Sequence, residues 1–170
     1  MSSTTTVKNN IIDTVVSVRR VTKVTKGGKR FSFSAFVVSG DREGRIGIGQ
    51  GKGREATSAI DKASSRARKS MVEFPLRGST LPYPVEGKHG SSMVVIRSAY
   101  KGTGVIAGGP VRAVMDALGV KDVLAKSIGS ANQLNVVKAT LNALAKLRSA
   151  KHIARLRNKT VEELVRGSNV

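Results

Sequence analysis

Eight of the chain's 18 glycines fall between Gly27 and Gly53, and five Lys and Arg residues lie among them. Because glycine has no Cβ, it adopts positive φ and lets the backbone approach a neighbouring group closely. Turns built from glycine and flanked by cations therefore suit contact with a phosphate backbone, through backbone N–H groups and charge. The same glycines also suit tight hairpin turns, and this stretch alone leaves both interpretations open.

Basic residues are densest around the first glycine pair. Six cations flank Gly27 and Gly28: Arg19, Arg20, Lys23, Lys26, Lys29 and Arg30. With the hydroxyls of Thr22 and Thr25 beside them, this loop is suited to recognising RNA shape or bridging two phosphate strands. The alternative is an edge strand that its cations protect from pairing. The density of charge favours contact with RNA, so the six cations and the two glycines are all predicted to bind RNA.

The run Gly47-Ile48-Gly49-Gln50-Gly51-Lys52-Gly53 invites comparison with nucleotide-binding loops, but its spacing differs from theirs. A Walker A loop needs Ser or Thr after Gly-Lys, where Gly53 stands, and Lys52 occupies the third glycine position of the dinucleotide pattern. A strand-to-helix turn lined with N–H groups still suits one phosphate of a nucleic acid. Arg45, Lys52 and Arg54 are accordingly predicted to contact RNA.

A second glycine motif, Gly102-Thr103-Gly104-Val105-Ile106-Ala107, matches the relaxed dinucleotide pattern, and Asp122 stands about twenty residues further on, where a ribose-binding acid belongs. The surrounding unit is too short for a full doubly wound sheet, so a packed glycine-rich loop is the preferred interpretation. His89 and His152 lack carboxylates at ligand spacing, and no nucleophile can be matched to a base. The sequence predicts no catalytic residue, no metal site and no cofactor.

The charge balance points to a polyanionic partner. The chain has 30 Lys and Arg against 11 Asp and Glu, a formal net charge of +19. Residues 1–76 carry 15 basic and 6 acidic groups, and residues 77–170 carry 15 and 5, so both halves share the excess. Such charge is typical of nucleic-acid binding. A DNA-compacting protein and a nucleotide-dependent enzyme using Gly102–Ala107 remain as alternatives.

The remaining composition bears on compartment. The chain has no Cys, which fits a reducing compartment, and no apolar run near the length needed to span a bilayer. We expect a soluble, cytoplasmic protein without a membrane partner or a small-molecule substrate.

The elements that carry these residues divide into two units. In the first unit we expect three antiparallel strands backed by one helix over Arg54–Val72. The strands are Ile11–Val24, which bends or ends near Arg19–Arg20, then Arg30–Val37, and then Arg45–Gln50. In the second strand, Phe31 and Phe33 are expected on the core face and Phe36 on the other face. The proline-rich stretch from Pro75 to Pro84 marks the boundary.

Beyond this boundary we expect a second α+β unit. Its elements are a strand at Ser92–Ile96, a helix at Pro110–Leu118, a strand at Val120–Ser127, a helix capped by Asn132 or Asn135, and a last helix opened by the capping box Thr160-Val161-Glu162-Glu163. The expected organisation is a disordered tail (1–10), a first domain (11–74), a linker (75–83), a second domain (84–150) and a helical extension (151–170).

Several motifs in the same order resemble the family of bacterial small-ribosomal-subunit protein five. They include Gly27-Gly28-Lys29-Arg30-Phe31-Ser32-Phe33, Gly44-Arg45-Ile46-Gly47, Gly102–Gly109, Val123-Leu124-Ala125-Lys126 and Asn135-Val136-Val137. The resemblance spans about Ile11 to Val165. It implies an α+β chain of two domains: a truncated double-stranded-RNA-binding fold of sheet plus helix, and an α+β domain with an unusual left-handed βαβ crossover.

The resemblance also implies a function. Members bind 16S ribosomal RNA, contact small-subunit proteins four and eight, support assembly of the body and neck, and influence accuracy near the messenger RNA entry path. By this likeness, Thr22–Gly28 is the RNA-contacting loop, and Gly102, Thr103, Gly104 and Arg112 match the region associated with accuracy and the contact with protein four. Lys101 stands where some members have an acidic residue, which puts the charge beside that loop in question.

Overall fold

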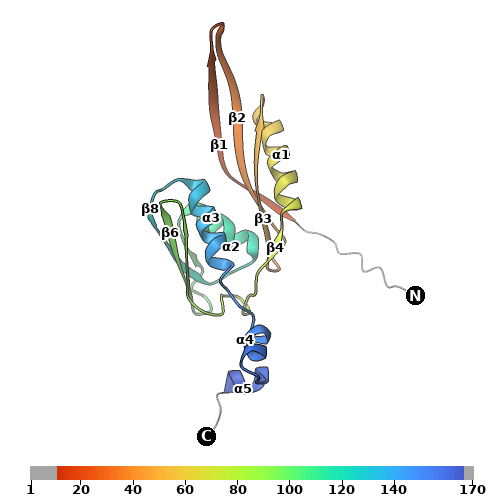
Figure 1. Ribbon diagram of the computed structural model, residues 1–170, viewed down its shortest axis with the longest axis vertical. Helices are drawn as coiled ribbons and strands as arrows, with labels where there is room; N and C mark the ends of the chain where they lie inside the picture. The colour runs from red at the N-terminus through yellow and green to blue at the C-terminus, as the bar shows by residue number, and fades with distance from the viewer. Residues whose placement is uncertain (1–10, 167–170) are drawn as a thin grey trace, which may run out of the picture.

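The computed structural model describes residues 11–166, which form two four-stranded sheets and five helices (Figure 1). The tail expected at 1–10 and the last four residues of the expected extension lie outside the described residues. The α+β class is confirmed.

The first sheet has the order β1-β2-β3-β4, with every neighbouring pair antiparallel. Its strands are β1 (Ile12–Thr25), β2 (Gly28–Gly40), β3 (Arg45–Gly53) and the short β4 (Val72–Glu73), which the sequence did not reveal. The expected end or bend of β1 near Arg19–Arg20 is wrong. The ladder with β2 continues to Thr25, and its irregularity lies between Val15 and Ser17. The alternation is imperfect because the outer half of β1 is exposed.

Helix α1 (Ala56–Lys69) packs closely on β3, and alternate glycines of that strand make this possible. A Cβ on Gly47, Gly49 or Gly51 would lie 2.1, 2.0 or 2.1 Å from a backbone carbonyl oxygen of α1. The glycines that resemble a nucleotide loop therefore face a helix. The apolar face of α1 is correspondingly small, with Ala59, Ala63 and Ala67 buried, and the helix is shorter at both ends than expected.

The second sheet has the order β5-β6-β8-β7. Its strands are β5 (Val85–His89), β6 (Ser92–Ser98), β7 (Val105–Ile106) and β8 (Val123–Gly129). Helix α2 (Gly109–Leu118) connects β7 to β8, which pair in parallel, so the β-α-β unit implied by the resemblance is present. The left hand of its crossover stays a prediction.

One end of each long helix in this half is marked by the residue that the sequence predicted. Gly119 ends α2 with φ of 90°, and the side chain of Asn132 caps α3 (Gln133–Leu144) by accepting a hydrogen bond from the Leu134 N–H at 3.3 Å. Helix α3 covers β5 and β6, where a Cβ on Gly87 would lie 2.2 Å from the carbonyl oxygen of Ala139.

The two halves share one hydrophobic core. Helix α2 contacts all three long strands of the first sheet as well as β7 and α3. The inner half of β2 is therefore buried on both faces: Ala35 and Val37 pack under α1, while Phe36 and Val38 join the core with α2. The expectation that Phe36 lies outside the core is wrong, because a second layer covers that face of the sheet.

The hairpin after β2 strengthens this junction. The N–H groups of Arg42 and Gly44 donate to the carbonyl oxygens of Ala117 and Leu118, each at 3.1 Å. These carbonyls belong to the last turn of α2, which leaves them without partners inside the helix. The first half of the chain thus completes the end of a helix in the second.

The C-terminal extension forms α4 (Ala150–Leu156) and α5 (Val161–Arg166), which lie below the body in Figure 1. The capping box is confirmed: the Glu163 N–H donates to Thr160 Oγ1 at 3.3 Å, and the Thr160 N–H donates to Glu163 Oε2 at 3.0 Å. None of the described helices combines the length and apolar character that crossing a membrane requires.

Candidate nucleic-acid interface

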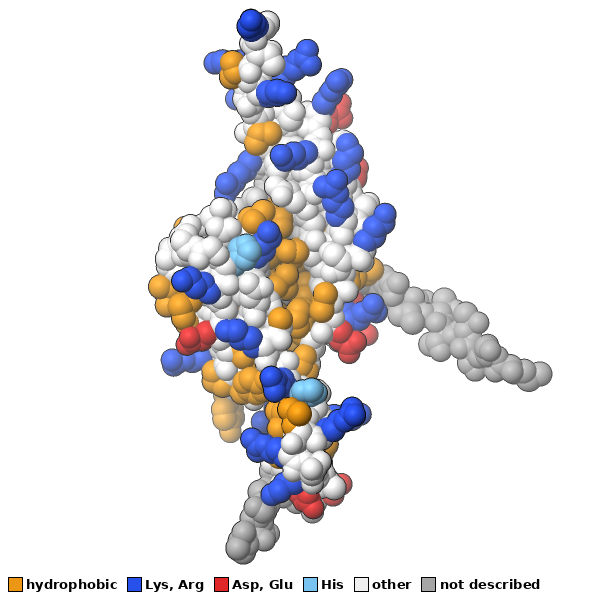
Figure 2. Space-filling view, viewed as in Figure 1, with side chains coloured by type: hydrophobic (Ala, Val, Ile, Leu, Met, Phe, Trp, Pro, Cys, Tyr) orange, Lys and Arg blue, Asp and Glu red, His pale blue; other side chains and the backbone are white. Residues whose placement is uncertain are grey.

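The outer halves of β1 and β2 form an arm, which we define as residues 18–31. It extends beyond α1 and the body, and Lys and Arg side chains surround it (Figures 1 and 2). Every residue of the arm is exposed. The register opposes Lys23 to Arg30 and Val24 to Lys29, which brings cations from both strands to the tip. The structure therefore gathers one group of predicted RNA-binding residues: Arg19, Arg20, Lys23, Lys26, Gly27, Gly28, Lys29 and Arg30.

The tip of the arm is a tight turn that depends on glycine at one position. Gly28 has φ of 133°, and the Thr25 hydroxyl donates to the Gly28 carbonyl oxygen at 3.1 Å. In the described part of the chain, no atom lies within 4 Å of a Cβ built on Gly27 or Gly28. Their backbone is therefore open to a neighbour, unlike that of the β3 glycines.

Phe31 lies on the surface of the arm, contrary to the prediction that it faces the core. It is 51% exposed, and the Arg20 guanidinium lies 4.8 Å from the centre of its ring. The period-2 pattern places Phe31 on the same face as Ala35, but neither α1 nor α2 reaches this far along β2. The arm thus presents an aromatic side chain and a stacked cation to its surroundings.

A basic groove of about 570 Å³ lies between the arm and the start of α1. Lys23 of β1, Lys52 of β3 and Arg54 of the following turn line it, and so does Lys62 of α1. Among residues 11–166, no carboxylate lines the groove, so an anion would relieve the repulsion among four cations. The structure therefore brings together three predicted residues and adds Lys62. The sequence signal that could have found Lys62 is its helical spacing from Arg66 and Lys69, which puts the three cations on one face of α1.

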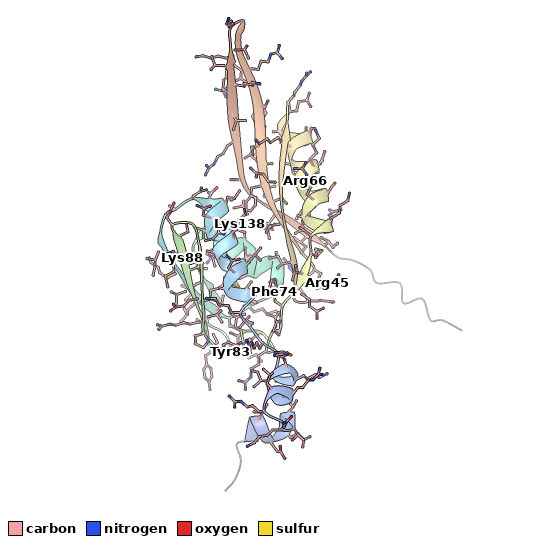
Figure 3. The ribbon with its side chains drawn as sticks, viewed as in Figure 1. Arg45, Arg66, Phe74, Tyr83, Lys88 and Lys138 are labelled. Atoms are coloured by element: carbon pink, nitrogen blue, oxygen red, sulfur yellow. The ribbon has the colours of Figure 1, made fainter. Side chains whose placement is uncertain are left out.

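Two other cations of α1, Arg66 and Arg68, bind groups within the protein. Arg66, labelled on α1 in Figure 3, donates to the carbonyl oxygen of Gln50 on β3 at 2.6 Å. Arg68 forms a 2.6 Å ion pair with Asp13, the one such pair among the described side chains. Burial of Asp13 opposes its ionisation, but hydrogen bonds from Arg68 and Ser39 outweigh this effect and hold the pKa of Asp13 below its ordinary value. These two arginines stabilise the first half of the chain.

Arg45 lies apart from the basic groove. It opposes Glu73 on β4 and stands near Phe74 at the far end of the sheet from the arm (Figure 3). Lys52 lies seven residues further along β3, a distance of about 23 Å at 3.3 Å per residue. The structure therefore does not place Arg45 with the other predicted RNA-binding residues.

A second surface contains the residues matched to accuracy. Gly102, Thr103 and Gly104 form a loop before β7 in which the first two residues are exposed and Gly104 is half-buried. Arg112 of α2 joins this loop by donating to the Val105 carbonyl oxygen at 2.8 Å. Gly102 and Gly104 have φ of 95° and 76°, and no atom of the described residues lies within 4 Å of a Cβ built on either. Glycine is thus required there by backbone conformation, since space is available.

The side chain of Asp122 is hydrogen-bonded to this loop. The residue is 4% exposed, and its carboxylate accepts hydrogen bonds from the N–H groups of Gly102 and Gly104 at 2.8 and 3.1 Å. The acid that the dinucleotide pattern would assign to a ribose is therefore used inside the protein. Within residues 11–166 there is also no group of three or more His, Cys, Asp or Glu side chains suited to a metal ion.

Comparison with known proteins gives a consistent result along the chain. Residues 11–75 match the family model of the ribosomal protein S5 N-terminal domain, and residues 87–157 match that of its C-terminal domain. A protein of Nitrosococcus oceani is 50% identical over 159 residues, 94% of this chain and 94% of the relative. One of Pelagibacter ubique is 48% identical over 158 residues, covering 92% and 93%, and one of Granulibacter bethesdensis is 51% identical over 158 residues, covering 92% and 83%. Each of these relatives is named small ribosomal subunit protein uS5. The chain belongs to the ribosomal protein S5 family, whose members are structural ribosomal proteins and not enzymes.

Proposed function

We propose that this protein is a structural constituent of the small ribosomal subunit that binds 16S ribosomal RNA through its arm and basic groove. The observation that carries the proposal is the arrangement of exposed cations: six lie on the arm, and four, with Lys23 common to both sets, line one groove to which no described carboxylate contributes. Phosphate contacts of this kind fix the position of a protein on RNA. Arg45 supplies a separate contact at the other end of β3.

Gly102, Thr103, Gly104 and Arg112 form the contact with small-subunit protein four, and another surface of the chain meets protein eight. Through these contacts the protein supports assembly of the body and neck and accuracy near the messenger RNA entry path. It acts on the ribosome in the cytoplasm, with no cofactor. In support, Gly102, Thr103 and Arg112 are exposed, and Arg112 donates a hydrogen bond to the carbonyl oxygen of Val105, directly after the loop.

We assign these roles to the parts of the chain in order. Residues 11–74 form the RNA-binding domain, 75–83 the linker, 84–150 the domain with the protein-contacting loop, and 151–170 an extension. The shared core fixes the first and second domains relative to each other.

Binding to a fragment of 16S ribosomal RNA across a salt series tests the proposal. If about eight phosphates are engaged, affinity falls by roughly three orders of magnitude or more between 50 and 200 mM salt. Changing Lys26 and Lys29 together to Gln should lower affinity and reduce the salt slope by about 2, since each phosphate contact contributes close to one. The matched control is Lys88→Gln with Lys126→Gln, which removes the same charge from exposed positions on the second sheet.

A binding curve nearly flat in salt, or equal effects of the arm and control pairs, would contradict the assignment. Duplex DNA added as competitor separates the alternative of a DNA-compacting protein. A protein that recognises A-form shape and 2′-hydroxyls should be displaced more readily by structured ribosomal RNA.

A further inference from the structure

We propose that Asp122 is the positioning residue of the Gly102–Gly104 loop, fixing the shape that this loop presents to its protein neighbour and tying it to Ser79 in the linker. The role of the loop as a protein contact rests on the proposed function. The positioning by Asp122 rests on the hydrogen bonds and burial of its carboxylate.

Three donors converge on the two carboxylate oxygens of Asp122. Oδ1 accepts from the N–H groups of Gly102 and Gly104, at 2.8 and 3.1 Å, and Oδ2 accepts from the Ser79 hydroxyl at 2.8 Å. The side chain stands directly before β8, which anchors it to the second sheet. Asp122 is thus joined at once to the loop and to the linker.

The backbone around Asp122 is also hydrogen-bonded to both Ser79 and the loop. The N–H groups of Lys121 and Asp122 donate to the Ser79 carbonyl oxygen at 2.9 and 3.1 Å, and the Val123 N–H donates to the Gly104 carbonyl oxygen at 3.1 Å. Hydrogen bonds from Ser79 first, and then from the Gly104 N–H, lower the pKa of Asp122 below its ordinary value. The carboxylate is therefore ionised at neutral pH, and its bonds are charge-assisted, which makes them stronger than neutral ones.

The loop has few other restraints. Gly102 and Gly104 both have positive φ, and the loop's own closing contacts are the N–H and hydroxyl of Thr103, which donate to the Tyr100 carbonyl oxygen at 3.1 and 2.7 Å. Glycine at two positions gives the unrestrained backbone many accessible conformations. Two N–H groups aimed at one fixed oxygen select a single conformation among them.

Hydrogen exchange on the full chain tests the positioning. In Asp122→Ala, the amides of Gly102 and Gly104 should exchange on the order of tenfold faster or more, because each loses a charged acceptor. Asp122→Asn keeps an oxygen without the charge, and Ser79→Ala removes one donor, so both should give smaller increases. The matched control is Asp116→Ala, an exposed aspartate on α2. Exchange in β6 should be unchanged in every variant.

Small subunits carrying the same variants supply the functional readout. Misreading of a reporter should change several-fold in Asp122→Ala and stay at the wild-type level in Asp116→Ala, with equal incorporation of both proteins. Wild-type exchange in the loop of Asp122→Ala overturns the positioning role, and if that variant does not fold, wild-type exchange in both Ser79→Ala and Asp122→Asn overturns it equally. Faster exchange with unchanged misreading supports the positioning and overturns instead the assignment of the loop to accuracy.

Discussion

Replacing Gly49 by Ala should destabilise the protein strongly, although the change adds a single methyl group. The new Cβ would lie 2.0 Å from the Ala63 carbonyl oxygen and 2.6 Å from the Ala67 nitrogen, both in the backbone of α1. Ordinary contact begins at 3.4 Å, so α1 must move away from β3 by about 1.4 Å, the difference between 3.4 and 2.0. No side-chain rotation can relieve the clash.

The magnitude follows from what such a movement uncovers. A gap of 0.5–1 Å already forfeits roughly a quarter to a half of each dispersion contact across it. The contacts at risk join Ala59 and Ala63 to Ala35 and Val37, which form the core beneath α1. We expect a loss of about 3 kcal/mol, at the upper end of overpacking effects. At roughly 2–4 °C per kcal/mol for a chain of this size, the melting temperature should fall by about 6–12 °C.

Thermal and urea unfolding of the isolated protein, followed by far-ultraviolet circular dichroism, measure this loss. Gly27→Ala is the matched control, because no atom that the structure describes lies within 4 Å of its built Cβ. It should change stability by less than about 0.5 kcal/mol. Equal stability of Gly49→Ala and wild type would refute the packing argument. Weaker RNA binding by a Gly49→Ala protein of undiminished stability would also refute it, because that result would indicate that Gly49 contacts phosphate.

Two further predictions test the placement of particular side chains. Phe36→Ala should lower the free energy of unfolding by about 3–5 kcal/mol, and Phe31→Ala by less than about 1 kcal/mol, because Phe36 is 5% exposed and Phe31 51%. Similar losses for the two variants in urea unfolding would contradict the placement of Phe36 in the core and of Phe31 on the surface. For Asp13, a folded-state pKa below the ordinary 3.8 means stability that is full above that pH and is lost as the pH falls through the lowered value. Acid unfolding monitored by circular dichroism should show a smaller loss over this window in Arg68→Ala than in Arg66→Ala, whose guanidinium bonds a carbonyl oxygen; indistinguishable acid transitions would argue against the ion pair.

Sequence reasoning predicted the elements well where local signals are strong. Pro110, Gly119 and the Thr160 capping box mark helix ends by local chemistry, and each helix was found where these signals place it. Sequence reasoning was less successful in predicting which face of a strand is buried. Periodicity put Phe31 inside and Phe36 outside, because alternation tells which residues share a face but not how far a covering layer reaches.

The glycine run shows the same limit for the candidate site. Glycine permits close approach of the backbone, but the sequence does not say whether RNA or a helix makes the approach. In β3 the neighbour is α1, whose small Ala residues repeat every four positions opposite the glycines. Lys62 was missed for a related reason: its membership of the groove depends on how α1 lies against the arm, which is a tertiary property.

One strand joins the rigid and the exposed parts of the first domain. Beyond Phe33, β2 is covered by α1 on one face and by α2 on the other, while its first four residues are exposed. A two-stranded hairpin alone is marginally stable in water. The arm therefore owes its direction to the buried half of β2, and its exposed Val24 and Phe31, 70% and 51% exposed, are left without a layer to pack against. A folded RNA on the arm would provide that layer and neutralise the cations beside it, so binding should order the arm while leaving the shared core unchanged.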